Sequence, residues 1–515
     1  MKKSRLFINI VMFLVIFSVL AAAVFFHIMT APININEQNY IPGGVLYKQY
    51  TLYRDYPYVQ MPYLPIIYGI FYKLTGTSYY FLTGRLFTLF FTLASAVFLY
   101  LIAYKFTGSF YYSILTPVLF CLNDVIMVPM KESSNYIMPI AFSLAGFYFF
   151  AASLAKSKTS IMGILVSGFF VSAAAGSRLL YAPIAAAYLL TVVFYPNSFS
   201  LLARIKKIIL PFGLGALIGQ LPTIYYMIID YNAFVVNNLI YHSLTAKWFE
   251  MTGPFERLTF PGKWWFAFKI FRSFPGNSVL IVIFIVLLSV IFIQNKYWPL
   301  KNLKNLPYEL VLIILIVVIA AITMFIPRPI YIQYFALPAP FIILFISYAY
   351  GNIKIKKKAA INLLLLAAVF AALAGSVPQY YRLAASYSGF ENLTPLKVHN
   401  NAMEMRRSIG EVKDGDKVAT LYPVLVLDSN LEIYNELATG LWLYPVADLI
   451  PQKYRKNLVY VSRFEIYDFF KKNQPKAILV DSNRTYDARF AKFAELKNYT
   501  KVDKDFDGYI LYVRP

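Results

Sequence analysis

Two carboxylates and a guanidinium in the polar segment 29–79 have the types and the setting for acid–base chemistry. Glu37, Arg54 and Asp55 stand there among many tyrosines and prolines. A carboxylate beside a bound substrate can remove the proton of an attacking hydroxyl group. A guanidinium gives charge-assisted hydrogen bonds to a phosphate. We therefore predict Asp55 and Glu37 as catalytic residues and Arg54 as a substrate-binding residue.

Other ionisable residues lie close to or within apolar stretches, where a charge is costly and a functional role is the default interpretation. Several cations that converge on one face would suit a phosphate or a pyrophosphate. Arg85 could instead extend to the membrane interface, His242 could pack among its aromatic neighbours, and the cations of 263–272 suit a lipid-headgroup surface. The predicted substrate-binding residues thus include Arg85, Asp124, Lys131, Glu132, Arg178, His242, Lys247 and Arg328.

The composition excludes a purely soluble protein. Of the 515 residues, 59% are hydrophobic and only 14% are charged, whereas soluble domains are about one quarter charged. The single cysteine, Cys121, cannot form an internal disulfide and excludes a cysteine-based metal centre. Three histidines are too few for a histidine cluster, so we predict no metal site. In a membrane protein, the net charge of +23 indicates basic retention loops and anionic lipids.

Apolar stretches must position these residues, because a membrane-spanning helix needs about 20 mainly apolar residues. The first stretch follows MKKSR and is predicted to be a retained helix. The third and fourth stretches, like the fifth and sixth, are joined so tightly that the count could change by one. About eleven spans are predicted, at 6–28, 80–104, 109–130, 134–154, 159–177, 179–195, 208–230, 277–294, 308–326, 330–350 and 359–377.

The short basic loops set the predicted orientation, because positive residues stay on the cytoplasmic side. With eleven spans these loops all fall on one side, so the N-terminus is inside and the C-terminus outside. The long polar segments 29–79 and 231–276, and the tail from 378, then lie on the outer face. The basic residues are Lys2, Lys3, Arg5, Lys156, Lys158, Arg204, Lys206, Lys207, Lys296, Lys301, Lys304, Lys354, Lys356, Lys357 and Lys358.

The outer segments predict a helix in the membrane interface and a small folded tail. The stretch 61–74 is apolar but too short to span, and its tyrosines suit the headgroup level. In the tail, 417–423, 477–481 and 508–514 are typical of strands, and 467–473 of a helix. The predicted fold is thus a multi-pass α-helical membrane domain, 1–377, with a catalytic first outer loop at 29–79, and an extracytoplasmic α+β domain, 378–515.

The order of the motifs resembles a known family. The chain from Asn36 to about position 91 resembles the opening of the GT-C superfamily of integral-membrane glycosyltransferases, in particular the protein-mannosyltransferase and aminoarabinose-transferase branch. GSRLLYAP, around Arg178, resembles the Gly-x-x-Arg segment of that family, and IYIQYFALPAP, which contains Tyr331, resembles its late Tyr-rich span. In the opening the matching residues are Asn36-Glu37, Tyr40, Tyr53-Arg54-Asp55, Pro62, Pro65 and Gly84-Arg85-Leu86.

The sequence departs from the family at two acidic positions. One of them is Asn36 here, so the base would be Glu37 or Asp55. The other, at the start of the fourth span, corresponds to Asn135, so that Asp124 or Glu132 would have to replace it if an acid is needed. The resemblance adds Asn135 and Tyr331 to the predicted substrate-binding residues.

The resemblance implies a hexosyl-type enzyme that moves a sugar from a polyprenyl-phosphate carrier to an acceptor hydroxyl, with inversion at the anomeric carbon. Cations would stabilise the departing phosphate. No cofactor is required, although carboxylates and an asparagine could hold Mg²⁺ or Mn²⁺. The expected partners are the lipid-linked donor, a glycan, lipid or protein acceptor, and membrane lipid, with no nucleic acid. The expected location is the cell membrane, with the active site on the extracytoplasmic face.

Three alternatives stay open. A transporter or flippase of a lipid-linked sugar would need the basic groove but no carboxylate base. A polymerase or ligase would use a pyrophosphate-linked donor. A non-enzymatic scaffold would depend on the tail, 378–515, and not on the carboxylates of 29–79.

Overall fold

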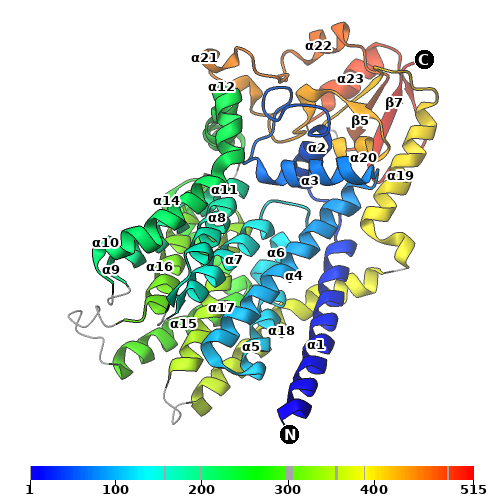
Figure 1. Cartoon of the computed structure of the whole chain (residues 1–515). Helices are drawn as coiled ribbons and strands as arrows, with labels where there is room; N and C mark the ends of the chain where they lie inside the picture. Colours follow the sequence, from blue (N-terminus) through cyan, green and yellow to red (C-terminus); the bar gives the residue numbers. More distant parts are fainter. Residues whose placement is uncertain are drawn as a thin grey trace.

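The computed structural model describes residues 2–155, 158–195, 199–253, 255–295, 306–353, 358–387, 389–483 and 486–515. A bundle of long helices carries a smaller unit of helices and strands at one end, and the first loop, 29–79, lies between the two (Figure 1). The apolar core runs through the bundle and into the first loop.

All eleven predicted spans contain helix. In the first half of the chain these helices are α1 (Lys2–Thr30), α4 (Tyr80–Thr107), α5 (Phe110–Cys121), α6 (Asp124–Met130), α7 (Ile137–Ser153), α8 (Ile161–Ser177) and α9 (Ile184–Phe194). In the second half they are α11 (Leu210–Ile229), α15 (Pro275–Gln294), α16 (Tyr308–Thr323), α17 (Ala339–Asn352) and α18 (Lys358–Ser386).

The chain is a membrane protein by the length and composition of these helices. Among the described residues, five helices are long and apolar enough to cross a membrane, or six if α5 and α6, which meet at a bend of 59°, form one span. The apolar helices α7, α8 and α16 have at most 17 residues each. The count of eleven spans and the orientation therefore stay predictions. Of the basic residues that set the orientation, Lys156, Lys296, Lys301, Lys304, Lys354, Lys356 and Lys357 lie outside the described residues.

Local sequence explains the break and the tight packing in the bundle. At the bend, the Asn123 side chain accepts hydrogen bonds from the first backbone N–H groups of α6 and so starts a new helix. Helices α8 and α11 pack closely because they meet at glycines. A Cβ atom on Gly168 would lie 2.0 Å from the Phe212 carbonyl oxygen, and one on Gly215 would lie 1.9 Å from that of Leu165.

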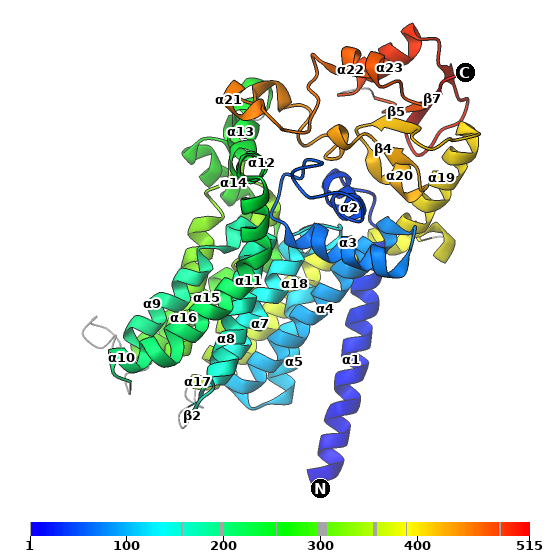
Figure 2. The same ribbon diagram turned by 45° about the horizontal axis from the view of Figure 1, so that its top comes forward.

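The first loop contains two helices that lie across the end of the bundle, α2 (Glu37–Leu46) and α3 (Tyr63–Thr75) (Figure 2). The prediction of a helix at 61–74 is confirmed by α3. This helix buries Tyr68 and Tyr72 and exposes Ile70, Phe71 and Leu74. It is therefore amphipathic, as a helix in the membrane interface would be.

The tail forms a five-stranded mixed sheet in the order β4-β3-β5-β7-β6. Strand β3 pairs in parallel with β4 and β5, whereas β7 is antiparallel to β5 and β6. The predictions of three strands and a helix in the tail are confirmed by β3, β5, β7 and α22. The strands are β3 (Lys417–Thr420), β4 (Glu432–Ile433), β5 (Ala477–Asp481), β6 (Thr500–Lys501) and β7 (Tyr509–Val513), and the main helices are α19 (Thr394–Ile409), α20 (Pro423–Asp428), α22 (Ile466–Lys472) and α23 (Ala488–Leu496).

The tail is bonded to the first loop and to the start of α4. Asp428 accepts a hydrogen bond from the Phe81 backbone N–H at 3.0 Å and so binds the first turn of α4. Three further side chains join the tail to the loop: Gln38 accepts from Val424 N at 3.0 Å, Asn435 donates to the Asp55 carbonyl at 3.1 Å, and Trp442 donates to the Ile35 carbonyl at 3.2 Å. The tail thus covers the loop that carries the predicted catalytic residues.

Candidate functional site

Glu37 and Arg85 form an ion pair with both side chains fully buried. The pair is bidentate, with Arg85 Nε 2.9 Å from Glu37 Oε1 and Nη2 2.8 Å from Oε2. The carboxylate also accepts from the backbone N–H groups of Ser133 at 2.7 Å and Asn34 at 2.8 Å. Each of its oxygens thus accepts two hydrogen bonds. The remaining Arg85 donors bind the backbone carbonyls of Ile28, Ala31 and Pro32.

Glu132 is a second buried carboxylate, in the turn between α6 and α7. Its side chain is 3% exposed, and its Oε1 accepts a hydrogen bond from Asn36 Nδ2 at 2.8 Å. Burial, followed by the nearby charge of Glu37, raises the pKa of Glu132 to about 8. Asn36 occupies a position at which the resembled family has an acidic residue. Here Asn36 thus binds a carboxylate from a different segment, that of Glu132.

Arg178 lies among aromatic rings at the end of α8. The backbone there is extended, which turns the side chain out of the helix. Its guanidinium carbon lies 3.7 Å from the centre of the Tyr136 ring and 5.4 Å from that of Tyr334. Its Nη1 donates to Asn135 Oδ1 at 2.5 Å. A pocket opens beside it, with one cation and otherwise aromatic, amide and apolar walls, lined by Tyr136, Ile140, Arg178, Leu180, Tyr181, Gln333, Tyr334, Ala336 and Leu337.

Hydrogen bonds between amides tie this pocket to the first loop. Asn135 Nδ2 donates to Gln60 Oε1 at 3.3 Å and to the Ser177 carbonyl at 3.0 Å. On the other side, Gln333 Nε2 donates to the Tyr136 hydroxyl at 3.0 Å. The first loop, the turn 131–136, the end of α8 and the segment before α17 therefore build one site.

Arg54 and Asp55 lie together at the surface of the loop. Arg54 Nε is 3.0 Å from Asp55 Oδ1, and the two side chains are 54% and 32% exposed. The hydrogen bond from Arg54 lowers the pKa of Asp55 below its ordinary value. No hydrogen bond or ion pair joins Asp55 to Glu37 or Glu132 among the described residues, so the structure does not bring the predicted catalytic carboxylates into contact.

Several of the other predicted residues occupy separate places. Asp124 accepts from the backbone N–H groups of Gly276 at 2.8 Å and Asn277 at 3.0 Å, at the start of α15. Arg328 pairs with Glu250 at 2.9 Å, near the surface.

Lys131 is half-buried, forms no hydrogen bond or ion pair within the described part of the chain, and acts on Glu132 through its charge. Tyr331 packs on Tyr334, with ring centres 5.8 Å apart. His242 and Lys247 are exposed on α13 (Tyr241–Thr252).

Sequence reasoning missed the aromatic and amide residues that hold Arg178. Tyr136, Tyr334, Gln60 and Gln333 were not predicted. Two signals were present, because Tyr136 directly follows the predicted Asn135, and Gln333 and Tyr334 lie within the motif IYIQYFALPAP. In a chain with 43 tyrosines, however, no single tyrosine stands out.

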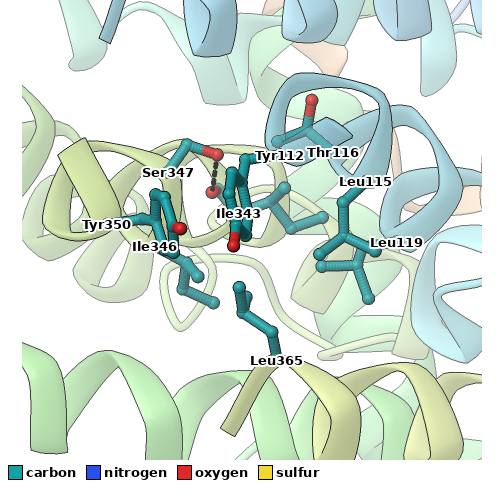
Figure 3. Close-up of a pocket in the computed structure, with 9 residues that line it drawn as sticks. All are labelled: Tyr112, Leu115, Thr116, Leu119, Ile343, Ile346, Ser347, Tyr350 and Leu365. Carbon is teal, nitrogen blue, oxygen red and sulfur yellow. Dashed lines mark hydrogen bonds between the residues drawn. The ribbon is translucent and has the colours of Figure 1, made fainter. Parts of the chain in front are cut away.

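Two further findings bear on what the protein could bind. Among the described residues, no group of three or more His, Cys, Asp or Glu side chains could hold a metal ion. A second pocket lies between α5, α17 and α18, toward the end of the bundle away from the tail (Figure 3). It is mostly apolar and is lined by Tyr112, Leu115, Thr116, Leu119, Ile343, Ile346, Ser347, Tyr350 and Leu365.

Comparison with known proteins identifies the fold. No protein-family model and no curated protein matches the chain. Among solved structures, ArnT from Cupriavidus metallidurans bound to undecaprenyl phosphate is similar, with a TM-score of 0.61, 10% sequence identity and 97% of each chain covered. The apo state of ArnT gives a TM-score of 0.61 at 11% identity and the same coverage. ArnT is a GT-C family aminoarabinose transferase, so the predicted resemblance to the GT-C superfamily is confirmed at the level of the fold.

Proposed function

We propose that this protein is a glycosyltransferase that moves a sugar from a polyprenyl-phosphate carrier to an acceptor hydroxyl. The transfer would take place on the extracytoplasmic face of the cell membrane, with inversion at the anomeric carbon. A hexose is the proposed sugar, and a glycan, lipid or protein the proposed acceptor. The similar ArnT structure binds undecaprenyl phosphate, which supports a carrier of this class.

The observation that carries the proposal is the pocket at Arg178. A guanidinium is the group that binds phosphate with directed, charge-assisted hydrogen bonds. Here it is buried, stacked on Tyr136, and bordered by apolar side chains such as Ile140 and Leu337. A phosphate at the end of an apolar chain has the matching chemistry, with the phosphate on Arg178 and the first isoprene units along the apolar wall.

We assign the base to Glu132 rather than to Glu37 or Asp55. Glu37 accepts four hydrogen bonds and neutralises Arg85. Asp55 is exposed, and Arg54 makes it a weaker base. Glu132 is buried, has a pKa of about 8, and accepts one hydrogen bond, from Asn36. A general base works best when its pKa is close to the working pH.

The proposed step balances without a cofactor. The acceptor oxygen forms a bond to the anomeric carbon, and its proton goes to the Glu132 carboxylate. The bond from the anomeric carbon to the phosphate oxygen breaks, and the polyprenyl phosphate leaves with the electron pair. Arg178 and the half-buried Lys131 would stabilise the charge that grows on that phosphate.

The test uses the full chain in lipid nanodiscs with farnesyl phosphate that carries radiolabelled mannose, glucose, galactose or aminoarabinose. The wild type should release label from at least one of these carriers. Glu132→Gln and Arg178→Ala should each lower that rate at least a hundredfold. Glu256→Gln and Arg272→Ala are matched controls, because both residues are exposed. Label retained on every carrier would overturn the proposal: movement of intact carrier across the bilayer would identify a flippase, and use of a pyrophosphate-linked donor a polymerase or ligase.

A further inference from the structure

Some of the buried polar groups that lack a well-formed hydrogen bond lie beside the candidate site, and others are spread through the bundle and the tail. The hydroxyl groups of Tyr58 and Ser134 and both amide atoms of Asn39 are buried and have no hydrogen-bond partner among the residues that the structure describes, and the Tyr40 hydroxyl has only a weak side-chain interaction with Arg178. All four side chains are nine-tenths or more buried. Buried polar groups in folded proteins are nearly always bonded, so each exception needs an explanation.

The other tyrosines of the first loop show that the fold can satisfy such groups. The hydroxyl of Tyr53 donates to the Gln60 carbonyl at 2.5 Å, that of Tyr56 to the Gly43 carbonyl at 2.7 Å, and that of Tyr72 to the Tyr80 carbonyl at 3.0 Å. These three hydroxyls of the first loop therefore have backbone partners. Tyr40 and Tyr58 differ from their neighbours in this respect.

The unpaired groups come from three segments that meet at the site. On α2, Asn39 and Tyr40 follow Asn36 by three and four positions and so share its face of the helix. Asn36 is the residue bonded to Glu132, in the turn that also contains Ser134. The Tyr58 ring centre lies 6.4 Å from that of Tyr40.

The Tyr40 hydroxyl is close to both proposed reactive groups. Arg178 interacts with it through a weak side-chain hydrogen bond and its charge, Glu132 acts on it through its charge, and Tyr136 is a further neighbour. The tail closes the opposite side, because the Trp442 ring lies 6.0 Å from that of Tyr40. The unpaired hydroxyls therefore lie where a sugar would sit if its phosphate were on Arg178 and its acceptor beside Glu132.

We propose that Tyr40, Tyr58, Ser134 and Asn39 form the subsite that binds the hydroxyl or amino groups of the transferred sugar. This inference rests on the proposed function and adds the residues that recognise the sugar. Tyrosine and serine hydroxyls and an asparagine amide can each donate and accept, as recognition of sugar hydroxyls requires. The aromatic faces of Tyr40 and Trp442 suit the apolar face of a sugar ring.

The test removes hydroxyl groups that have no well-formed internal hydrogen bond. Tyr58→Phe should keep the thermal midpoint of the wild type, because no internal hydrogen bond is lost, and Tyr40→Phe should change it little, because only the weak interaction with Arg178 is lost. Each should lower kcat/KM at least tenfold for the farnesyl-phosphate sugar that the wild type consumes. Tyr56→Phe and Tyr72→Phe are matched controls with the opposite pattern: each loses a bonded hydroxyl, so the midpoint should fall while kcat/KM stays within about twofold.

Deoxy-sugar carriers give the second measurement. If a hydroxyl of the sugar bonds to Tyr40, a carrier whose sugar lacks that hydroxyl should react more slowly with the wild type. The rate of Tyr40→Phe should be the same with both carriers. If the wild type is active and both Tyr40→Phe and Tyr58→Phe transfer the sugar at the wild-type rate, the proposed subsite is refuted. Absence of transfer from every carrier by the wild type would instead overturn the proposed function, and the subsite with it.

Discussion

The buried pair of Glu37 and Arg85 yields the sharpest prediction, because it separates a structural carboxylate from a catalytic one. Glu37→Gln removes the charge but keeps the shape of the side chain. Arg85 would then be a buried cation with no counter-charge among the groups that it contacts directly. Breaking a buried pair by removing one partner costs about 3–5 kcal/mol, which is a large part of the roughly 5–15 kcal/mol that holds a domain folded.

The assay is thermal unfolding in detergent, followed by transfer activity of the folded fraction. Glu37→Gln should lower the unfolding midpoint strongly. The double variant Glu37→Gln/Arg85→Met should recover much of that loss, since it removes the unpaired cation as well. Per folded molecule, the transfer rate should fall much less than in Glu132→Gln. If Glu37→Gln is as stable as the wild type but has lost transfer activity, the reasoning is refuted. Glu37 would then be the base, which is one of the two options that the sequence left open.

Three further predictions concern the proposed site. The transfer rate should rise with pH and level off above about 8, because Glu132, with a pKa of about 8, accepts a proton only when it is ionised; a flat profile from pH 6 to 9 would contradict this. Lys131→Met should move that rise to higher pH, because the positive charge of Lys131 lowers the pKa of Glu132; an unmoved profile would exclude the coupling. Arg178→Lys should raise the KM for the donor about tenfold while the thermal midpoint changes little, because an ammonium keeps the charge but loses the guanidinium contact with the Tyr136 ring; an unchanged KM would place the donor phosphate elsewhere.

Much of the fold could be predicted from local patterns. Hydrophobic stretches of helical length predicted the helices of the bundle, and short alternating or apolar runs predicted β3, β5 and β7. These signals are local, because they depend on which residues lie within one helix or one strand. The span count was harder to predict, because α7, α8 and α16 are apolar but short, and length alone does not separate a short span from a buried helix.

The partners of the charged residues could not be predicted in the same way. Glu37 had the pattern of a free acid in a polar loop, yet Arg85, from α4, neutralises it. Asp124 had the pattern of an intramembrane charge with a function, yet it binds the first N–H groups of α15. In both cases the partner lies far along the chain, and only the packing of helices brings the two together.

The sequence by itself determined the class of molecule, because composition and periodicity set how much apolar surface must be buried and in which shape. It also determined which segments hold the reactive side chains, since charges in apolar surroundings are costly and few. Only the tertiary structure decided which carboxylate accepts four hydrogen bonds, Glu37, and which accepts one, Glu132. Glu132 and Asn36 are separated by most of the first loop and by α3 to α6, yet their side chains are 2.8 Å apart. The basicity of a carboxylate depends on burial and on such neighbours, and these exist only once the chain has folded.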